Sequence, residues 1–180
     1  ISDHFPLFYH KMANLGAQVN SDDYWDDIYL EEWDSAKRIW PTKNALIEEK
    51  TNVSDKILDV ACGTGSILRH LKTRGYEHLY GTEISNICVK RLTACDIGMV
   101  KSVLPKIEYN DNMFDVVIAS QILEHIIDRH AFLQEIHRIL KPGGCCFLFV
   151  PNDCLGPIDE PSHVVKFTGK SLDKELRSGF

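Results

Sequence analysis

The sequence lacks the features of a membrane or secreted protein. It has no apolar run near the roughly 20 residues that a helix needs to cross a bilayer, and its N-terminus has no basic segment followed by an apolar one. We therefore expect a cytoplasmic protein with no membrane partner.

An excess of basic residues is also missing. Lys and Arg number 20 against 26 Asp and Glu, which gives a formal net charge of −6. Because phosphate neutralisation dominates binding to duplex nucleic acid, this balance disfavours a nucleic-acid partner and favours a small-molecule substrate. The six cysteines are not spaced as a disulfide framework or as paired zinc ligands, so we expect reduced, mostly buried thiols.

No internal repeat, low-complexity tract or Gly/Ser linker divides the 180 residues, which indicates a single domain. Short apolar runs alternate with amphipathic stretches, and several runs are apolar at consecutive positions, as in strands buried on both faces of a parallel sheet. Ser85 and Asp128 are predicted helix N-caps. The pattern predicts an α/β fold: a Rossmann-like, doubly wound, mostly parallel sheet with helices on both faces. The predicted strands are residues 56–61, 78–82, 97–104, 115–120 and 145–150.

The first part of the chain differs from the rest. Residues 1–55 contain all three tryptophans and an acidic aromatic stretch at 21–33, followed by a helix that Pro41 could open. We expect these residues to form a helical cap over the ligand edge of the sheet, and residues 56–180 to form the Rossmann-like core.

The acidic aromatic stretch contains candidates for a lid. Tyr24, Trp25 and Tyr29 fall within one or two helical turns and could cover cofactor or substrate. Plain packing of an amphipathic helix is the alternative. The acids of this stretch are expected to form a solvated face: Asp22, Asp23, Asp26, Asp27 and Glu31.

A glycine loop follows the first predicted strand. Small residues at Ala61, Gly63 and Gly65 let the backbone turn sharply and let a ligand approach closely. A dinucleotide-binding loop would have the pattern GxGxxG, but its third glycine falls on Leu68, which disfavours a pyrophosphate and an NAD-dependent dehydrogenase. Glu83 ends the second predicted strand, 20 residues after Gly63, where a carboxylate can accept both hydroxyls of a ribose.

Four ordered motifs over roughly residues 50–180 resemble the class I S-adenosylmethionine-dependent methyltransferases, in particular the small-molecule subset that includes the ubiquinone-biosynthesis type. They are ILDVACGTGSIL (57–68), GTEIS (81–85), FDVVIASQILEHI (114–126) and RILKPGG (138–144), followed by a strand ending in PN (151–152). The resemblance implies S-adenosylmethionine (SAM) as cofactor and S-adenosylhomocysteine (SAH) as product. It also implies methyl transfer to O or N of a small metabolite.

The resemblance further implies roles for single residues. The loop beneath the methionine moiety would be Asp59, Ala61, Gly63 and Gly65, with Glu83 holding the ribose, Ile84 beside adenine, and Ser120 and Gln121 near the amino acid end. Where the family often places an acid for the adenine amino group, this sequence has Ser102, Val103 and Leu104, so no side-chain partner is named. The family sheet normally ends with an antiparallel strand pair, but the chain stops at Phe180. Since an exposed sheet edge favours aggregation, we expect that this pair is missing through truncation.

Methyl transfer from a sulfonium is an in-line displacement that requires no metal, and none is expected. A hydroxyl acceptor usually requires a base. His125 and His163 follow the fourth and fifth predicted strands and are the candidates, with purely structural histidines as the alternative.

Two rival functions remain open at this point. Small-RNA 3′-terminal 2′-O-methyltransferases, which are metal-assisted, have an ExxEH pattern and a later histidine; here Gln121, Glu124, His125 and His163 occupy comparable places. Gln121 puts an amide where that pattern has a carboxylate, which weakens a hard-cation site. The other rival is a non-catalytic SAM-binding module. The sequence leaves the methyl acceptor and the oligomeric state open.

Overall fold

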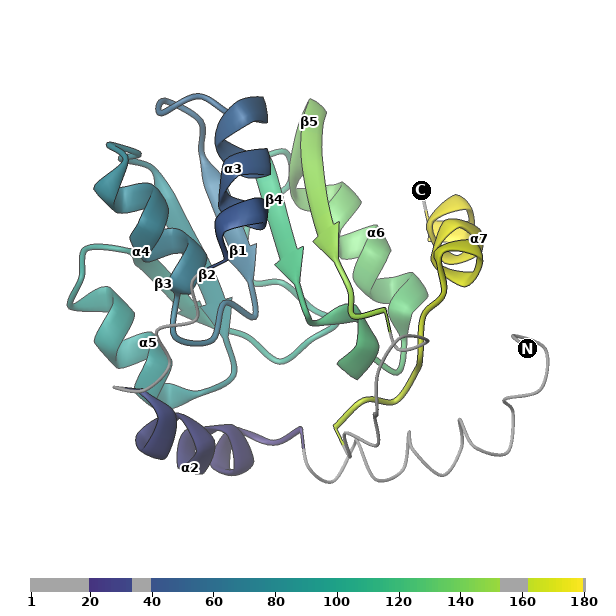
Figure 1. Cartoon of the computed structure of the whole chain (residues 1–180), viewed down its shortest axis with the longest axis horizontal. Helices are drawn as coiled ribbons and strands as arrows, with labels where there is room; N and C mark the ends of the chain where they lie inside the picture. The colour runs from purple at the N-terminus through teal and green to yellow at the C-terminus, as the bar shows by residue number, and fades with distance from the viewer. Residues whose placement is uncertain (1–19, 34–39, 153–161, 180) are drawn as a thin grey trace.

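The computed structural model describes residues 20–33, 40–152 and 162–179. The described residues form one parallel sheet of five strands in the order β3-β2-β1-β4-β5, which confirms the predicted Rossmann-like α/β fold (Figure 1). No strand follows β5 in the described residues. The strands are β1 (Ile57–Val60), β2 (Leu79–Glu83), β3 (Gly98–Lys101), β4 (Phe114–Ser120) and β5 (Leu140–Phe149).

Strand β5 begins earlier than predicted. Leu140 already pairs with Phe114, and the register then shifts before Cys145 pairs with Val116. The residues between, which include a glycine pair, form this irregularity and were expected only to end the preceding helix.

Three helices begin where the sequence predicted. Pro41 opens α3, the Ser85 hydroxyl accepts the Cys88 N–H at 3.2 Å, and the Asp128 carboxylate accepts the Ala131 N–H at 3.0 Å. Within the described ranges no helix has both the length and the apolar character that a membrane crossing requires. The helices are α2 (Asp22–Glu32), α3 (Pro41–Lys50), α4 (Ser66–Thr73), α5 (Asn86–Thr93), α6 (Arg129–Ile139) and α7 (Gly169–Gly179), with a short 3₁₀ helix, η2 (Leu123–His125).

The central strand β1 is buried along its whole length because helices cover both faces of the sheet (Figure 1). Ile57 packs with Ile47 of α3 and Leu68 of α4. The next residue, Leu58, packs on the opposite face with Phe132 of α6. This arrangement explains the consecutive apolar residues of the strand, since successive side chains point to opposite faces.

Helix α2 lies across the edge of the sheet toward which the strands point (Figure 1). Asp26 holds it there: its carboxylate accepts hydrogen bonds from the Ser85 hydroxyl (2.5 Å), the Asn86 amide (3.0 Å) and the Ile87 N–H (3.2 Å). Burial opposes ionisation of Asp26, but these hydrogen bonds outweigh it and its pKa is lowered.

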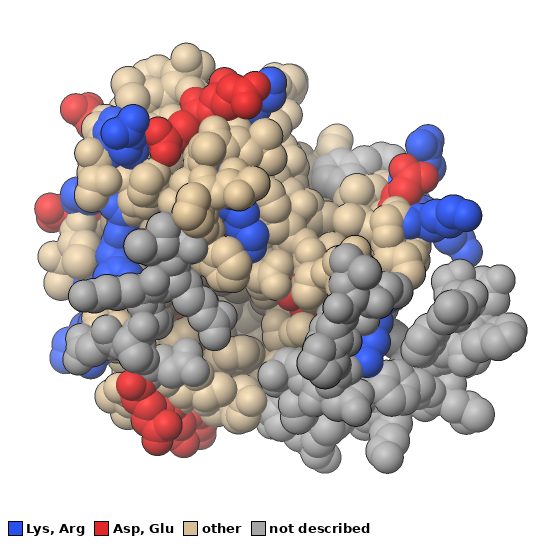
Figure 2. Space-filling model, viewed as in Figure 1, with Lys and Arg blue, Asp and Glu red and all other residues tan. Residues whose placement is uncertain are grey.

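The expectation of a fully solvated acidic face on α2 is therefore wrong in part. Asp26 anchors the helix to α5, and Asp22 pairs with Lys101 at 2.9 Å. Asp23, Asp27 and Glu31 are exposed, and Figure 2 shows the acidic side chains gathered over this helix at the lower edge of the molecule.

The cysteines in the described ranges are free but not mostly buried, so the expectation is wrong for them; Cys154 lies outside those ranges. Of the five in the described residues, Cys88 is buried, whereas Cys95 and Cys145 are exposed and Cys62 and Cys146 are half-buried. Cys145 is exposed because β5 is the last strand of the sheet; Cys95 lies in the turn after α5.

Candidate functional site

The loop after β1 turns sharply at three residues with positive φ: Ala61 (53°), Gly63 (54°) and Gly65 (69°). A Cβ atom on Gly65 would lie 2.5 Å from the Leu92 side chain, so only glycine fits there. The Cys62 N–H donates to the Thr82 carbonyl at 3.0 Å, which ties the loop to β2.

Glu83 ends β2 directly beside this loop. Its side chain is 4% exposed and accepts the N–H groups of Gly63 (2.7 Å), Ile84 (2.8 Å) and Ser85 (3.2 Å). Burial raises the pKa of Glu83, although the three backbone donors counteract that rise. The structure thus brings the predicted ribose-binding acid against the predicted glycine loop.

Two cavities lie at this edge of the sheet. The first, about 370 Å³, extends over the loop and Asp59 to Ser120 and His163. The second, about 330 Å³, extends from Glu83 and Ile84 to residues 102–105. Every predicted site residue except Gly65 lines one or both of them. The residues that line both are Trp25, Tyr29, Ala61, Gln121 and His125.

The aromatic side chains of α2 stand between the two cavities. Tyr29 covers the loop so closely that a Cβ on Gly63 would lie 2.9 Å from its hydroxyl oxygen. Trp25 stacks on Tyr29 with ring centroids 5.7 Å apart and contacts the edge of His125 at 5.8 Å. Tyr24 lines the first cavity. The lid candidates therefore lie over the glycine loop.

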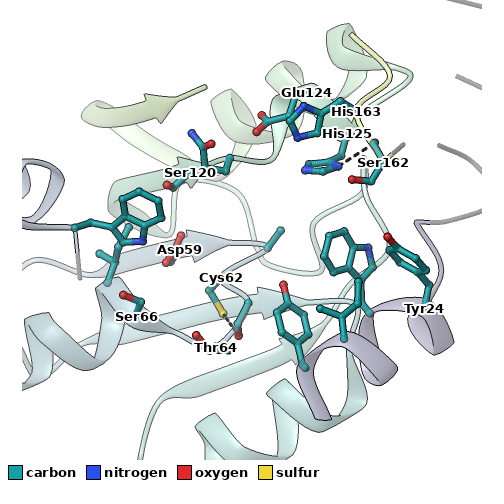
Figure 3. Close-up of a pocket in the computed structure, with 18 residues that line it drawn as sticks. Tyr24, Asp59, Cys62, Thr64, Ser66, Ser120, Glu124, His125, Ser162 and His163 are labelled. Carbon is teal, nitrogen blue, oxygen red and sulfur yellow. Dashed lines mark hydrogen bonds between the residues drawn. The ribbon is translucent and has the colours of Figure 1, made fainter. Parts of the chain in front are cut away.

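A cluster of Glu124, His125 and His163 lies on one side of the first cavity (Figure 3). The two histidine rings meet edge to face at 4.8 Å, and one possible ligand atom from each of the three side chains lies within 4.8 Å of the others. Nδ1 of His125 is 3.0 Å from the Ser162 carbonyl oxygen. The segments are held together because the Val164 N–H donates to the Glu124 carbonyl at 2.8 Å. The sequence had placed both histidines after carboxyl ends of strands, and the structure brings them together between η2 and the segment before α7.

Gln121 lines the same cavity as this cluster, and its amide nitrogen is directed to β5. Its backbone has a φ of 58°, and its side-chain amide lies 3.4 Å from the Phe149 carbonyl oxygen of β5. Ser102 lines the second cavity, but its hydroxyl donates to the Lys106 carbonyl at 2.6 Å.

Lys43 is a functional candidate that the sequence did not indicate. Its ammonium donates to the Ser120 hydroxyl oxygen at 3.0 Å and lies 4.0 Å from the centre of the Trp40 ring. Burial lowers the pKa of Lys43, and the nearby Glu124 and Asp59 oppose that shift. A lysine in an amphipathic helix is ordinarily solvated, so only the packing of α3 near the ends of β1 and β4 reveals it.

Asp59 is the most strongly perturbed acid of the site. It is 3% exposed at the end of β1, and burial, with a smaller effect of Glu83, raises its pKa to about 8, while Lys43 lowers it. A ligand that brings a positive charge would stabilise the ionised form of this buried carboxyl group.

The chain matches known proteins over most of the region that carries this site. A family model described as a methyltransferase domain matches residues 58–148, just over half of the chain. Demethylmenaquinone methyltransferase of Chlorobaculum tepidum is 27% identical over 146 residues, which are 80% of this chain and 54% of that protein. Cycloartenol-C-24-methyltransferase 1 of Oryza sativa is 31% identical over 135 residues, 69% of this chain and 37% of that protein. The chain thus spans about half or less of these two relatives.

Two further comparisons bear on reaction and fold. The mitochondrial arginine-hydroxylase NDUFAF5 of Mus musculus is 32% identical over 89 residues, 48% of this chain and 26% of that protein. The crystal structure of an S-adenosylmethionine-dependent methyltransferase from Mesorhizobium loti superposes with a TM-score of 0.65 at 22% identity. That superposition covers 81% of this chain and 82% of the other, so the two share a fold.

The raised pKa of Asp59 leads to a prediction on stability. Between pH 3.8 and about 8 the folded chain keeps a proton that the unfolded chain has lost. The contribution of this group to the free energy of unfolding is therefore full below pH 3.8 and is lost as the pH rises through about 8. Asp59→Asn removes this pH dependence. The free energy of unfolding of the variant, relative to that of the natural chain, should therefore rise by more than about 1 kcal/mol between about pH 5 and pH 8.

The measurement is urea unfolding followed by circular dichroism at a series of pH values. Asp27→Asn, on the exposed face of α2, corrects for the loss of one charge. A stability difference between the Asp59→Asn chain and the natural one that does not change with pH would show that Asp59 is ionised in the folded chain at neutral pH.

Proposed function

Since the chain belongs to the class I S-adenosylmethionine-dependent methyltransferase family, we propose that it transfers a methyl group from SAM to an oxygen or nitrogen of a small metabolite and releases SAH. The observation that carries the proposal is the contact between the glycine loop and the buried Glu83 carboxylate, 2.7 Å from the Gly63 nitrogen to Oε2. Parallel sheets bind ligands beyond the carboxyl ends of their strands, and both residues lie there.

The residues present fit SAM in parts. Glu83 offers carboxylate oxygens for the ribose hydroxyls, and Ile84 offers an apolar surface for adenine in the second cavity. The first cavity, with Asp59 and Ser120, suits the charged amino acid end. Tyr29 lies over Gly63 and between the two cavities. The sulfonium would bind at this junction of the two cavities. This assignment keeps for Asp59, Glu83, Ile84 and Ser120 the roles that the family resemblance implied.

SAM, when bound, supplies a methyl group on a positively charged and electrophilic sulfur. The chain then has to align an acceptor with that methyl group, which can contribute roughly 7–11 kcal/mol, and to exclude water. We assign the exclusion of water to Tyr24, Trp25 and Tyr29 as a lid. For a hydroxyl acceptor, His125 is the base: the Ser162 carbonyl can only accept, so Nδ1 carries the proton and Nε2 is the basic nitrogen toward the acceptor.

The acceptor proposed is a small molecule and not a nucleic acid. Demethylmenaquinone and cycloartenol, in the names of the two relatives, are small apolar molecules. The net charge of −6 opposes an extended phosphate backbone. We also propose a cytoplasmic location, which agrees with the absence of an apolar run of membrane-spanning length.

The direct test is incubation of the protein with methyl-labelled SAM and a metabolite extract, followed by mass spectrometry. The expected result is one labelled small-molecule product formed together with SAH. Production of a hydroxylated compound without label transfer would instead favour a reaction like that named for the arginine-hydroxylase relative.

Replacement of Glu83 by Ala should weaken SAM binding by more than about tenfold, because hydrogen bonds to a charged partner contribute about 1.5–3 kcal/mol each. Isothermal titration calorimetry with SAM measures the affinity, and circular dichroism checks that the loop change leaves the fold intact. Glu77→Ala, an exposed acid just before β2, is the control. Equal affinity in the Glu83→Ala and natural chains would remove the ribose assignment.

A second candidate function follows from the cluster of Glu124, His125 and His163. One carboxylate and two imidazoles suit a divalent transition metal, and the Ser162 carbonyl near Nδ1 of His125 is the kind of partner that orients a ligating histidine. A divalent ion held there would polarise an acceptor hydroxyl. This is the chemistry of the metal-assisted RNA 3′-terminal methyltransferases, although the displaced Gln121 leaves that pattern incomplete.

The two roles of His125 predict different responses in one assay. If His125 is a base, His125→Ala should lower turnover about 10²–10⁴-fold with SAM affinity nearly unchanged, and a chelator should not affect the natural chain. If His125 is a metal ligand, the natural chain should lose activity when a chelator is added and regain it with added Zn²⁺ or Mn²⁺. Turnover of His125→Ala equal to that of the natural chain contradicts both roles and leaves a structural histidine.

A further inference from the structure

Two side chains from distant parts of the chain meet at one carbonyl oxygen beside the candidate base. The Ser162 carbonyl oxygen lies 3.0 Å from Nδ1 of His125, as Figure 3 shows. The same oxygen accepts a hydrogen bond from the side-chain amide of Asn20, with Nδ2 at 3.1 Å. A carbonyl oxygen can accept two hydrogen bonds, so both contacts can exist together.

Asn20 stands at the start of the lid. It directly precedes Ser21, the N-cap of α2, whose hydroxyl accepts the Tyr24 N–H at 3.3 Å. The place of the Asn20 amide therefore depends on where α2 lies. The same helix supplies a second contact, because the Trp25 ring meets the His125 ring edge to face with the centroids 5.8 Å apart.

The segment before α7 is attached to η2 on the other side of the base. The Val164 N–H donates to the Glu124 carbonyl at 2.8 Å, and the His163 ring meets the His125 ring at 4.8 Å. These contacts keep the segment beside η2. The two hydrogen bonds to the Ser162 oxygen come instead from side chains, one on η2 and one at the start of the lid.

The tautomer and the orientation of a histidine ring are set by the partner of its second nitrogen. For His125 that partner is the Ser162 carbonyl, which can only accept, so Nδ1 carries the proton. Within the function proposed above, on which this inference rests, the base needs this form to direct Nε2 to the acceptor. We infer that Asn20 is a positioning residue: the lid holds the Ser162 carbonyl through Asn20 and the ring of the base through Trp25. The base is then fully oriented only while α2 covers the cleft.

The tautomer of His125 tests this inference. Nuclear magnetic resonance of the chain with nitrogen-labelled histidine, at about pH 8 where an ordinary histidine is neutral, should show the Nδ1–H form of His125 in about tenfold excess. His125→Gln identifies the signals by their loss. Asn20→Ala removes one hydrogen bond to the Ser162 oxygen and should lower the ratio of the Nδ1–H to the Nε2–H form by about threefold or more.

Two controls accompany this variant. The ring of His70, with Nε2 at 2.6 Å from Glu48, should keep its signals in the Asn20→Ala chain. Asn110→Ala, at an exposed asparagine before β4, should leave the ratio for His125 unchanged. If Asn20→Ala does not fold, Asn20→Leu decides in its place, because it fills the volume of the amide without a donor.

An unchanged ratio in the Asn20 variant, or a natural chain in which Nε2 of His125 carries the proton, overturns the inference. Turnover of methyl-labelled SAM with the metabolite extract gives a second measurement. Asn20→Ala should lower kcat about tenfold while the KM for SAM changes by less than about twofold, as for the loss of a group that orients another. An unchanged kcat also overturns the inference. A natural chain that transfers no methyl group would overturn the proposed function, and the tautomer ratio would still decide whether the lid orients His125.

Discussion

The site depends on the hydrogen bond from the Gly63 N–H to the Glu83 carboxylate, 2.7 Å long. It joins the loop after β1 to the end of β2, and two further N–H groups hold the same carboxylate in one position. A buried carboxylate is costly unless it is hydrogen-bonded, so the backbone donors are what permit Glu83 to stay at the floor of the cleft. Oε1 already accepts two N–H groups, but Oε2 accepts only the Gly63 N–H and keeps one lone-pair site, so the structural role of Glu83 is compatible with a ligand role.

The cleft concentrates acidic groups. Asp59, Glu83 and Glu124 are all buried near the loop, and Lys43 is half-buried beside them. Burial of like charges raises the free energy of the ionised state, which is why the pKa of Asp59 rises to about 8. SAM carries a sulfonium and an ammonium against one carboxylate. Its net positive charge would relieve that repulsion, whereas SAH lacks the sulfonium charge, so the same electrostatics favour the exchange of product for cofactor.

The sequence predicted the parts of this site that follow directly from strand ends. Consecutive apolar residues located β1 and β4, and Glu83 was assigned from its place at the end of the second predicted strand, whereas the roles of Asp59 and Ser120 came from the family resemblance. What it could not predict comes from packing between distant segments. Lys43 and Asp26 are ordinary charged residues on helices, and their roles appear only when α3 and α2 lie against the sheet edge.

The start of β5 and the exposure of Cys145 were missed for a related reason, since edge position and register are properties of the assembled sheet.

The attachment of α2 explains how a covered cleft could admit a ligand. Trp25 and Tyr29, four residues apart, share the helix face over the loop, while Asp26 and Asp22 connect the helix to α5 and Lys101. The Asp22–Lys101 pair is largely exposed and contributes little. Among the contacts of the described residues, the helix is held by the hydrogen bonds of one carboxylate and by aromatic contacts, whereas β1 is buried on both faces. Local opening requires less free energy where fewer apolar groups are buried, so α2 should move before the sheet does. Trp25 and Tyr29 belong to the lining that the two cavities share, so movement of α2 would widen the passage between the cavity at Asp59 and the cavity at Glu83.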